Sequence, residues 1–69
     1  MNDDLSEEAL RAHLIEVRQE HADLDSVVLA LSQLAMPDML LIGRLKRKKL
    51  ALKDEIARME DQLTPDIIA

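Results

Sequence analysis

The chain has 69 residues, enough for one domain at most, and a net charge of −5, which argues mildly against nonspecific nucleic-acid binding. It contains no cysteine, which excludes disulfides, and no Phe, Tyr or Trp, the side chains that bury the most area in compact cores and binding pockets. One glycine and two prolines provide few turns, so a β-rich fold is not expected. A chain this short usually gains only ~3–5 kcal/mol from its own core, and oligomerisation is the remaining way to stabilise it.

A first helix is predicted over residues 6–35, after an irregular lead-in of residues 1–5. Ser6 is a favourable N-cap, and Glu7 and Glu8 follow in the first turn, where the helix dipole favours negative charge. Apolar residues then recur at alternating intervals of four and three, which is a heptad seam and not a strand period. The seam, with one polar member, consists of Leu10, Leu14, Val17, His21, Leu24, Val28, Leu31 and Ala35.

A second helix is predicted over residues 38–63. Pro37 disfavours helical geometry at Met36 and suits the start of a new helix, so the turn is placed at residues 36–37. The second seam again has one polar member and consists of Ile42, Leu45, Lys49, Leu52, Ile56, Met59 and Leu63. Gly43 lies inside this helix, where glycine costs about 1 kcal/mol relative to alanine.

A connection this short makes the two helices antiparallel neighbours, so that facing residues have numbers summing to about 73. In this register the following pairs are apolar: Leu10 with Leu63, Leu14 with Met59, Val17 with Ile56, Val28 with Leu45, and Leu31 with Ile42. The predicted fold is therefore all-α, an antiparallel two-helix hairpin of coiled-coil type over residues 6–64, assembling into a helical bundle, with a tail over 65–69. The structural alternative is one continuous helix through Pro37, which proline disfavours by ~3 kcal/mol.

His21, Asp25 and Lys49 form a polar break in this seam. The register places His21 opposite Leu52, and it places Asp25 beside Lys49 or the neighbouring Lys48. Polar groups in a seam commonly fix register and partner number, at some cost in stability. We favour that structural role over a catalytic or ligand-binding role for these residues.

Two segments resemble motifs of a known family. His21-Ala-Asp-Leu-Asp-Ser-Val-Val28 resembles a His-x-x-Leu-Asp-x-x-Ile pattern, with Val28 in place of the isoleucine. Leu45-Lys-Arg-Lys-Lys-Leu-Ala-Leu-Lys-Asp-Glu-Ile56 resembles a Leu-Lys-Lys-x-Lys-Leu-x-Leu-Lys-Asp-Glu-Ile pattern. Together they are similar to the YdcH-like family of small bacterial proteins (domain of unknown function 465), over about residues 10–63. The resemblance implies a helical hairpin and a bacterial cytoplasmic protein, and it implies no activity, because the family has none firmly assigned.

The predicted turn is surrounded by apolar residues, which make up twelve of the sixteen positions from Val27 to Ile42. Outside the seam this tip carries Val27, Leu29, Leu34, Met39, Leu40 and Leu41. Monomers rarely expose an apolar patch larger than a few hundred Å², so these six residues are the predicted oligomer interface, the alternative being that they merely close the turn. Two weaker stripes that recur every seven residues would suit a four-helix assembly: Ile15, Ala22 and Leu29, and Gly43, Leu50 and Ala57.

A basic cluster lies in the second predicted helix and holds six of the nine Lys and Arg residues: Arg44, Lys46, Arg47, Lys48, Lys49 and Lys53. Such a cluster can contact phosphates, although stacking aromatics are missing and the facing part of the first helix is acidic. Cross-helix charge pairing is therefore favoured, with Asp25 near Lys46 and Arg11 near Glu60. The candidate face for an anionic partner is Arg44, Lys46, Arg47, Lys48 and Lys53.

No catalytic or cofactor-binding motif is found: there is no Gly-rich phosphate loop, nucleophile elbow or acidic calcium loop. His13 and His21 are eight positions apart, rather than the four that would place both on one helical face, so no metal site is expected. The acidic start of the chain is unlike a secretory signal, and the apolar tip is shorter than the ~20 residues that span a bilayer. We expect no enzyme activity, no cofactor, no membrane span and a cytoplasmic location.

The predicted function is that of a non-catalytic interaction or adaptor protein. We expect it to self-associate into a dimer or a higher oligomer, and a further protein partner is also compatible with the sequence. The rival from another class is nucleic-acid binding through the Arg44–Lys53 face. Salt separates the two, because phosphate contacts weaken steeply with added salt and apolar contacts do not.

Overall fold

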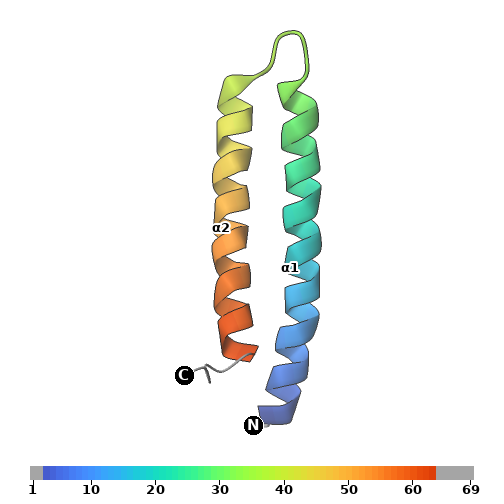
Figure 1. The fold of residues 1–69 in the computed structure, drawn as a ribbon, viewed down its shortest axis with the longest axis vertical. Coiled ribbons are helices and arrows are strands. Elements are labelled where there is room, and N and C mark those ends of the chain that lie inside the picture. Colours follow the sequence, from blue (N-terminus) through green and yellow to red (C-terminus); the bar gives the residue numbers. More distant parts are fainter. Residues whose placement is uncertain (1–2, 64–69) are drawn as a thin grey trace.

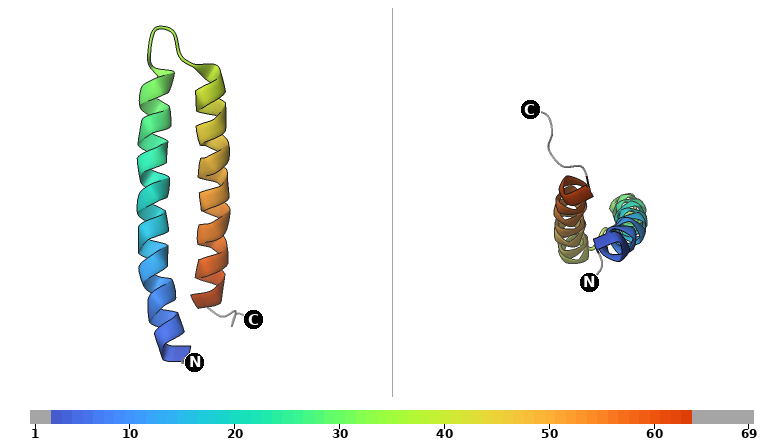
Figure 2. Two further views of the ribbon diagram at one scale, coloured as in Figure 1. Left: turned by 180° about the vertical axis from the view of Figure 1, so that it is seen from behind. Right: turned by 90° about the horizontal axis from the view of Figure 1, so that it is seen from below.

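Two long helices, packed side by side and antiparallel, make up residues 3–63, which are the residues that the computed structural model describes. α1 (Asp3–Ser32) has 30 residues and α2 (Met39–Leu63) has 25, and the chain reverses once between them (Figure 1). The views from behind and from below show the two helices as direct neighbours along their whole shared length (Figure 2). The predicted all-α antiparallel hairpin is confirmed. The predicted tail, residues 65–69, lies outside the described residues.

The hairpin is held together by one apolar cluster towards its open end and by two further buried side chains towards the turn. Towards the open end, Leu14 and Val17 of α1 bury themselves against Met59 of α2, and Val17 is 2% exposed. Towards the turn, Val28 and Ile42 are the other buried side chains among the described residues. Burying such a side chain fully stabilises a fold by roughly 1.5–3 kcal/mol, so a core of this size gives the single hairpin modest stability.

Three polar side-chain contacts join α1 and α2 and agree with the antiparallel register. His13 lies 3.2 Å from Glu55 near the open end, where Arg18 also donates to Glu60, and Lys49 lies 2.6 Å from Asp25 near the middle. The residue numbers of the three pairs have sums on both sides of the value of about 73 that the heptads predict. Apart from Lys49, which is itself a seam residue, the members of these pairs flank the seam, as charged residues of coiled coils commonly do.

α1 differs from the predicted helix 6–35 at both ends. It begins at Asp3, because no proline or glycine separates that residue from Ser6, which lies inside the helix and is not its N-cap. It ends at Ser32, where the amides of Gln33 and Leu34 bond the carbonyls three residues back, at 3.2 and 3.3 Å. Ala35 continues the apolar spacing but is exposed, so no packing holds it in the helix.

The connection covers residues 33–38, in place of the predicted two-residue turn at 36–37. Asp38 ends it as the N-cap of α2, where its carboxylate accepts the backbone N–H of Leu41 at 3.0 Å and its carbonyl accepts that of Ile42. α2 therefore begins at Met39, one residue later than predicted. The Asp38 carboxylate thus caps α2 from just outside the helix.

The Cα atoms span 50 × 26 × 14 Å, and the two helices lie side by side. The hairpin is thus a single layer with two broad faces. Most domains pack two or three layers around one core, whereas here neither face is covered by a second layer of the described chain.

Candidate functional site

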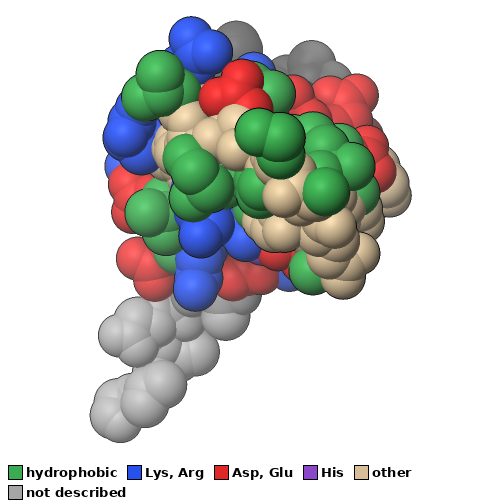
Figure 3. All heavy atoms as spheres, turned by 90° about the horizontal axis from the view of Figure 1, so that it is seen from above, with side chains coloured by type: hydrophobic (Ala, Val, Ile, Leu, Met, Phe, Trp, Pro, Cys, Tyr) green, Lys and Arg blue, Asp and Glu red, His purple; other side chains and the backbone are tan. Residues whose placement is uncertain are grey.

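The turn end of the hairpin exposes several large apolar side chains. Met36 is 88% exposed and Leu40 82%, with Met39 at 67%. Seen from above, onto the turn, hydrophobic side chains gather over this end, with Lys and Arg along the α2 side (Figure 3). This apolar end, together with the exposed side chains just below it on α1, is called the apolar tip.

Of the predicted interface residues, Val27, Leu29, Leu34, Met39 and Leu40 are exposed at the apolar tip, and Leu41 is half-buried. Leu41 stands next to the buried seam residue Ile42, so the hairpin itself covers part of its surface. Met36 is the tip residue that sequence reasoning left out, because it was treated as a turn residue. The sequence signal was its position directly before Pro37, where helical geometry is disfavoured and a side chain at the bend projects outward.

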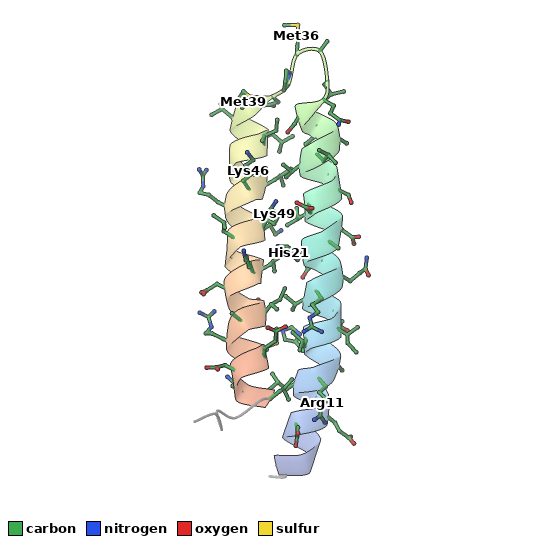
Figure 4. All side chains as sticks on the ribbon, in the orientation of Figure 1. Arg11, His21, Met36, Met39, Lys46 and Lys49 are labelled. Carbon is green, nitrogen blue, oxygen red and sulfur yellow. The ribbon has the colours of Figure 1, made fainter. Side chains whose placement is uncertain are left out.

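The polar break lies near the middle of the hairpin, where Figure 4 labels His21 and Lys49, between the apolar cluster of the open end and the buried Val28 and Ile42. The seam residues His21 and Lys49 are half-buried there, and Nζ of Lys49 donates to Oδ1 of Asp25 at 2.6 Å. The Lys49 ammonium lowers the pKa of Asp25 below its usual value of 3.8, first through this hydrogen bond and then through its charge, and His21 adds in the same direction. Of the two predicted partners, Lys48 or Lys49, the structure therefore pairs Asp25 with Lys49.

Two other predicted charge pairs are wrong. Arg11 does not reach Glu60, because its guanidinium binds Glu7 one turn earlier, at 2.9 Å, while Glu60 accepts from Arg18. Asp25 pairs with Lys49 rather than with Lys46, one turn nearer the tip, because a seam lysine lies closer to the opposite helix. Long side chains select partners within their own helix as readily as across the seam.

The basic cluster is largely uncompensated by the hairpin. Apart from Lys49, its five members are exposed and have no ion-pair partner among residues 7–63: Arg44, Lys46, Arg47, Lys48 and Lys53. The cross-helix pairing predicted for the cluster is therefore formed for one lysine. The others form a positively charged surface on α2.

A family model described as "Protein of unknown function (DUF465)" matches residues 14–60, about two thirds of the chain. The chain belongs to this family. The matched segment includes the polar break, the apolar tip and the basic cluster, all within the DUF465 region. No curated protein matches the chain, and no solved structure does.

Within the described part of this DUF465 chain, no three His, Cys, Asp or Glu side chains gather in a way that would hold a metal ion. The two ring nitrogens of His13 each lie near one carboxylate, Glu16 at 3.9 Å and Glu55 at 3.2 Å. Neither α1 nor α2, as described, contains a stretch with the length and apolarity needed to cross a membrane. The features that stand out are therefore surfaces: the apolar tip, the basic cluster and the uncovered broad faces.

Proposed function

We propose that this DUF465 protein is a non-catalytic helical-hairpin adaptor of the bacterial cytoplasm that associates with itself through its apolar tip. The observation that carries the proposal is the cluster of exposed large apolar side chains at one end. Met36, Met39 and Leu40 expose between 67% and 88% of their surface, and Val27, Leu29 and Leu34 expose 45–60%. Isolated exposed apolar residues are ordinary, but a contiguous group of this kind marks an interaction surface.

The small core of the hairpin supports the same proposal. With five buried apolar residues in the described chain and no disulfide to restrain the unfolded state, a single hairpin has little to offset the conformational entropy lost on folding. Covering the tip with a second copy would bury apolar area at roughly 25 cal/mol per Å² and stabilise both chains.

A non-catalytic role is supported by where the charged groups lie. Catalytic groups usually acquire perturbed pKa values inside a desolvated cleft, whereas the lowered pKa of Asp25 arises from an ion pair at the surface. The sequence also lacks the nucleophile, phosphate-loop and metal motifs of the common catalytic classes. Two ordered helices whose charged groups are solvated are better suited to binding a partner than to catalysing a reaction.

The proposal is tested by the molar mass in solution, measured by light scattering coupled to size-exclusion chromatography. At micromolar concentration the chain should run at a mass at least twice 7.8 kDa. Leu34→Glu combined with Leu40→Glu should reduce that mass while keeping the helical circular dichroism. Ala9→Glu combined with Ala51→Glu is the matched control, because it adds the same charge at exposed positions away from the tip. A folded wild-type monomer, or a tip variant of unchanged mass, would overturn the proposal.

Nucleic-acid binding is the second candidate, and the five unpaired cations on α2 favour it. If all five contacted phosphates, log K for duplex DNA would fall against log salt with a slope of up to about −4.5. Fluorescence anisotropy with a labelled random-sequence duplex, between ~50 and ~200 mM salt, measures this slope. Lys46→Gln with Arg47→Gln should then weaken binding and flatten the slope. Binding that is absent at low salt, or insensitive to salt, would rule this candidate out.

A further inference from the structure

One broad face of the hairpin carries a second set of apolar residues, away from the seam. Ile15 follows the buried Leu14 and lies one turn before Arg18 on α1; Ala57 lies one turn before Glu60 on α2. Because Arg18 and Glu60 bond each other across the helices, Ile15 and Ala57 are on the same side of the hairpin. The heptad repeat continues both positions up each helix, which defines the stripe face as Ile15, Ala22, Leu29, Gly43, Leu50 and Ala57.

The stripe face pairs a large residue with a small one at every level. In the observed register Ile15 lies level with Ala57, Leu50 with Ala22, and Leu29 with Gly43. The three large side chains are 60–67% exposed, so the hairpin itself does not cover them. The face therefore presents three large exposed side chains, each level with an alanine or glycine on the other helix.

Gly43 has no role inside the hairpin that would require a glycine. Its backbone has no positive φ, and a Cβ placed on it would meet nothing within 4 Å. Glycine in a helix costs about 1 kcal/mol relative to alanine, so the hairpin alone would be more stable with alanine there. What a missing side chain provides at this position is room for an approaching side chain or helix.

α1 carries an uncharged line along the same side. Residues at intervals of three and four form it: Ala12, Ile15, Gln19, Ala22, Ser26, Leu29 and Gln33. The helix has many charged residues, and between positions 7 and 32 all of them lie off this line. Alternation of three and four is the spacing of a helix–helix seam, and α1 uses its other such seam against α2.

We infer that a second copy of this chain covers the stripe face, related to the first by a twofold axis parallel to the helices, so that both turns lie at the same end of a four-helix bundle. This inference rests on the proposed self-association and specifies its geometry. In this arrangement α1 packs against α2 of the second copy, antiparallel and at the same level. Each large side chain then packs on a small residue of the other copy: Ile15 on Ala57, Leu50 on Ala22, and Leu29 on Gly43.

Charged residues lie between the two stripes, where Arg18 and Glu60 bridge the helices, and at two of three levels they would meet an opposite charge of the second copy. Arg11 comes level with Glu60 of the second copy, and Lys46 comes level with Asp25 of the second copy. Each acid already accepts from one cation of its own chain and keeps oxygen lone pairs for another. Lys53 is the exception, because Arg18 of the second copy, a like charge, lies at its level. The other two levels bring opposite charges together.

The hairpin is large enough for a dimer interface on this face. The hairpin extends over 50 × 26 Å along its two longer axes, so its size leaves room for a standard interface, which buries ~800 Å² per partner. Covering it gives the single-layered hairpin the second layer that domains normally possess. The reversed arrangement, with the turns at opposite ends, would oppose Leu50 to Leu50 and Ala22 to Ala22, which loses the match of large with small.

Disulfide trapping tests the geometry, and the chain has no cysteine of its own to interfere. Ile15→Cys and Ala57→Cys are made as separate variants, mixed and oxidised, and the products are separated on a non-reducing gel. The arrangement brings the two positions within reach of a disulfide, so the mixture should give a covalent dimer and neither variant alone should. Ala22→Cys should not cross-link with itself. Cross-linking of Ala22→Cys without cross-linking of the mixture would overturn the inferred axis.

Gly43→Leu is a second test that leaves the hairpin intact, since the hairpin offers open space at this position and leucine favours helix. It should keep or raise the helical signal while weakening dimerisation about tenfold or more, because the added side chain fills the place of Leu29 of the second copy. Ala51→Leu is the control, adding a leucine at an exposed position on the opposite broad face of α2. Unchanged dimerisation in Gly43→Leu would contradict the inference.

The two proposals fail in different ways. A doubled mass that depends on Leu34 and Leu40, with no cross-link between positions 15 and 57, overturns the stripe-face geometry and keeps self-association through the tip. Positions 15 and 29 are separated by about 21 Å along α1, so a contact confined to the tip does not reach Ile15. A folded monomer overturns both proposals.

Discussion

Lys49 and Asp25 are joined across the hairpin by an ion pair of 2.6 Å, and they differ in exposure: 24% of the lysine side chain and 65% of the aspartate side chain are accessible. The less exposed member of the pair is therefore the seam lysine, which contributes its aliphatic stem to the seam. The more exposed member is the solvated carboxylate of Asp25. Removing the lysine leaves no charge stranded in an apolar environment. This asymmetry determines the sign of the first prediction.

Lys49→Leu should raise the stability of the hairpin by about 1 kcal/mol, because a leucine in the seam buries more apolar area than the lysine stem and an exposed pair stabilises little. It should also relax control of register or oligomer number, as removal of a polar seam residue often does. Thermal unfolding and molar mass measure the two effects. Lys48→Leu, at an exposed position, is the control and should give no gain. A marked loss of stability in Lys49→Leu would mean that the pair with Asp25 matters more than the packing.

Asp25→Asn should change how stability depends on acid. Pairing with Lys49 lowers the pKa of Asp25 below 3.8, so its stabilisation is fully present above that value and is lost as the pH falls through the lowered pKa. The wild type should therefore exceed the variant in unfolding free energy by a constant amount near neutral pH, and the difference should shrink below pH 3.8. Urea titrations at a series of pH values give both curves. A difference that stays constant into acid would show that this carboxylate does not contribute through its charge.

Met59→Ala should destabilise the hairpin by about 2–5 kcal/mol, because Met59 is 4% exposed and closes the cluster of Leu14 and Val17. Leu52→Ala should cost less, since Leu52 is half-buried. Met36→Ala, at an 88% exposed position, should stay within about 0.5 kcal/mol of the wild type. Chemical denaturation of the three variants, at a dilution where the hairpin is monomeric, tests this order. Equal effects at positions 59 and 36 would contradict the observed core.

Asp38→Ala should cost about 0.5–2 kcal/mol, because the amide of Leu41 loses its cap at the start of α2. Asp38→Asn keeps an acceptor oxygen in the same place and should recover most of that stability. Hydrogen exchange at the first amides of α2 reports the loss directly. Identical protection in the alanine and asparagine variants would show that the cap contributes nothing.

The seam and its register could be read from the sequence, because heptad spacing selects which residues face each other. Val28 and Ile42, two predicted seam residues near the turn, are both buried, and the pairing of Asp25 with Lys49 follows from the same spacing. The helix ends could not be read in the same way. Ala35 satisfies the spacing and still lies outside α1, since helix ends depend on local backbone hydrogen bonds and on whether packing holds the last turn.

The sequence predicted that charged residues of the two helices would pair, but not which residues would pair with each other. Arg11 has one acid within its own helix and another across the seam, and the sequence does not show which one a long, flexible side chain selects. The exposed tip residues were identified from composition, and Met36 was missed because the turn was placed too narrowly around it. What covers the tip is a contact between molecules, and a pattern of contacts within one chain does not encode it.

Pro37, in the connection over residues 33–38, decides whether the seam closes within one chain or between two. If that connection became helical, α2 of one chain could pack on α1 of another, and the same contacts would form by domain swapping. A proline in a helix interior is disfavoured by ~3 kcal/mol, which opposes this straightening. Seam closure is then a first-order step that does not depend on concentration, and association of hairpins is a separate second-order step. Dilution should therefore take an assembly apart into folded hairpins rather than into unfolded chains.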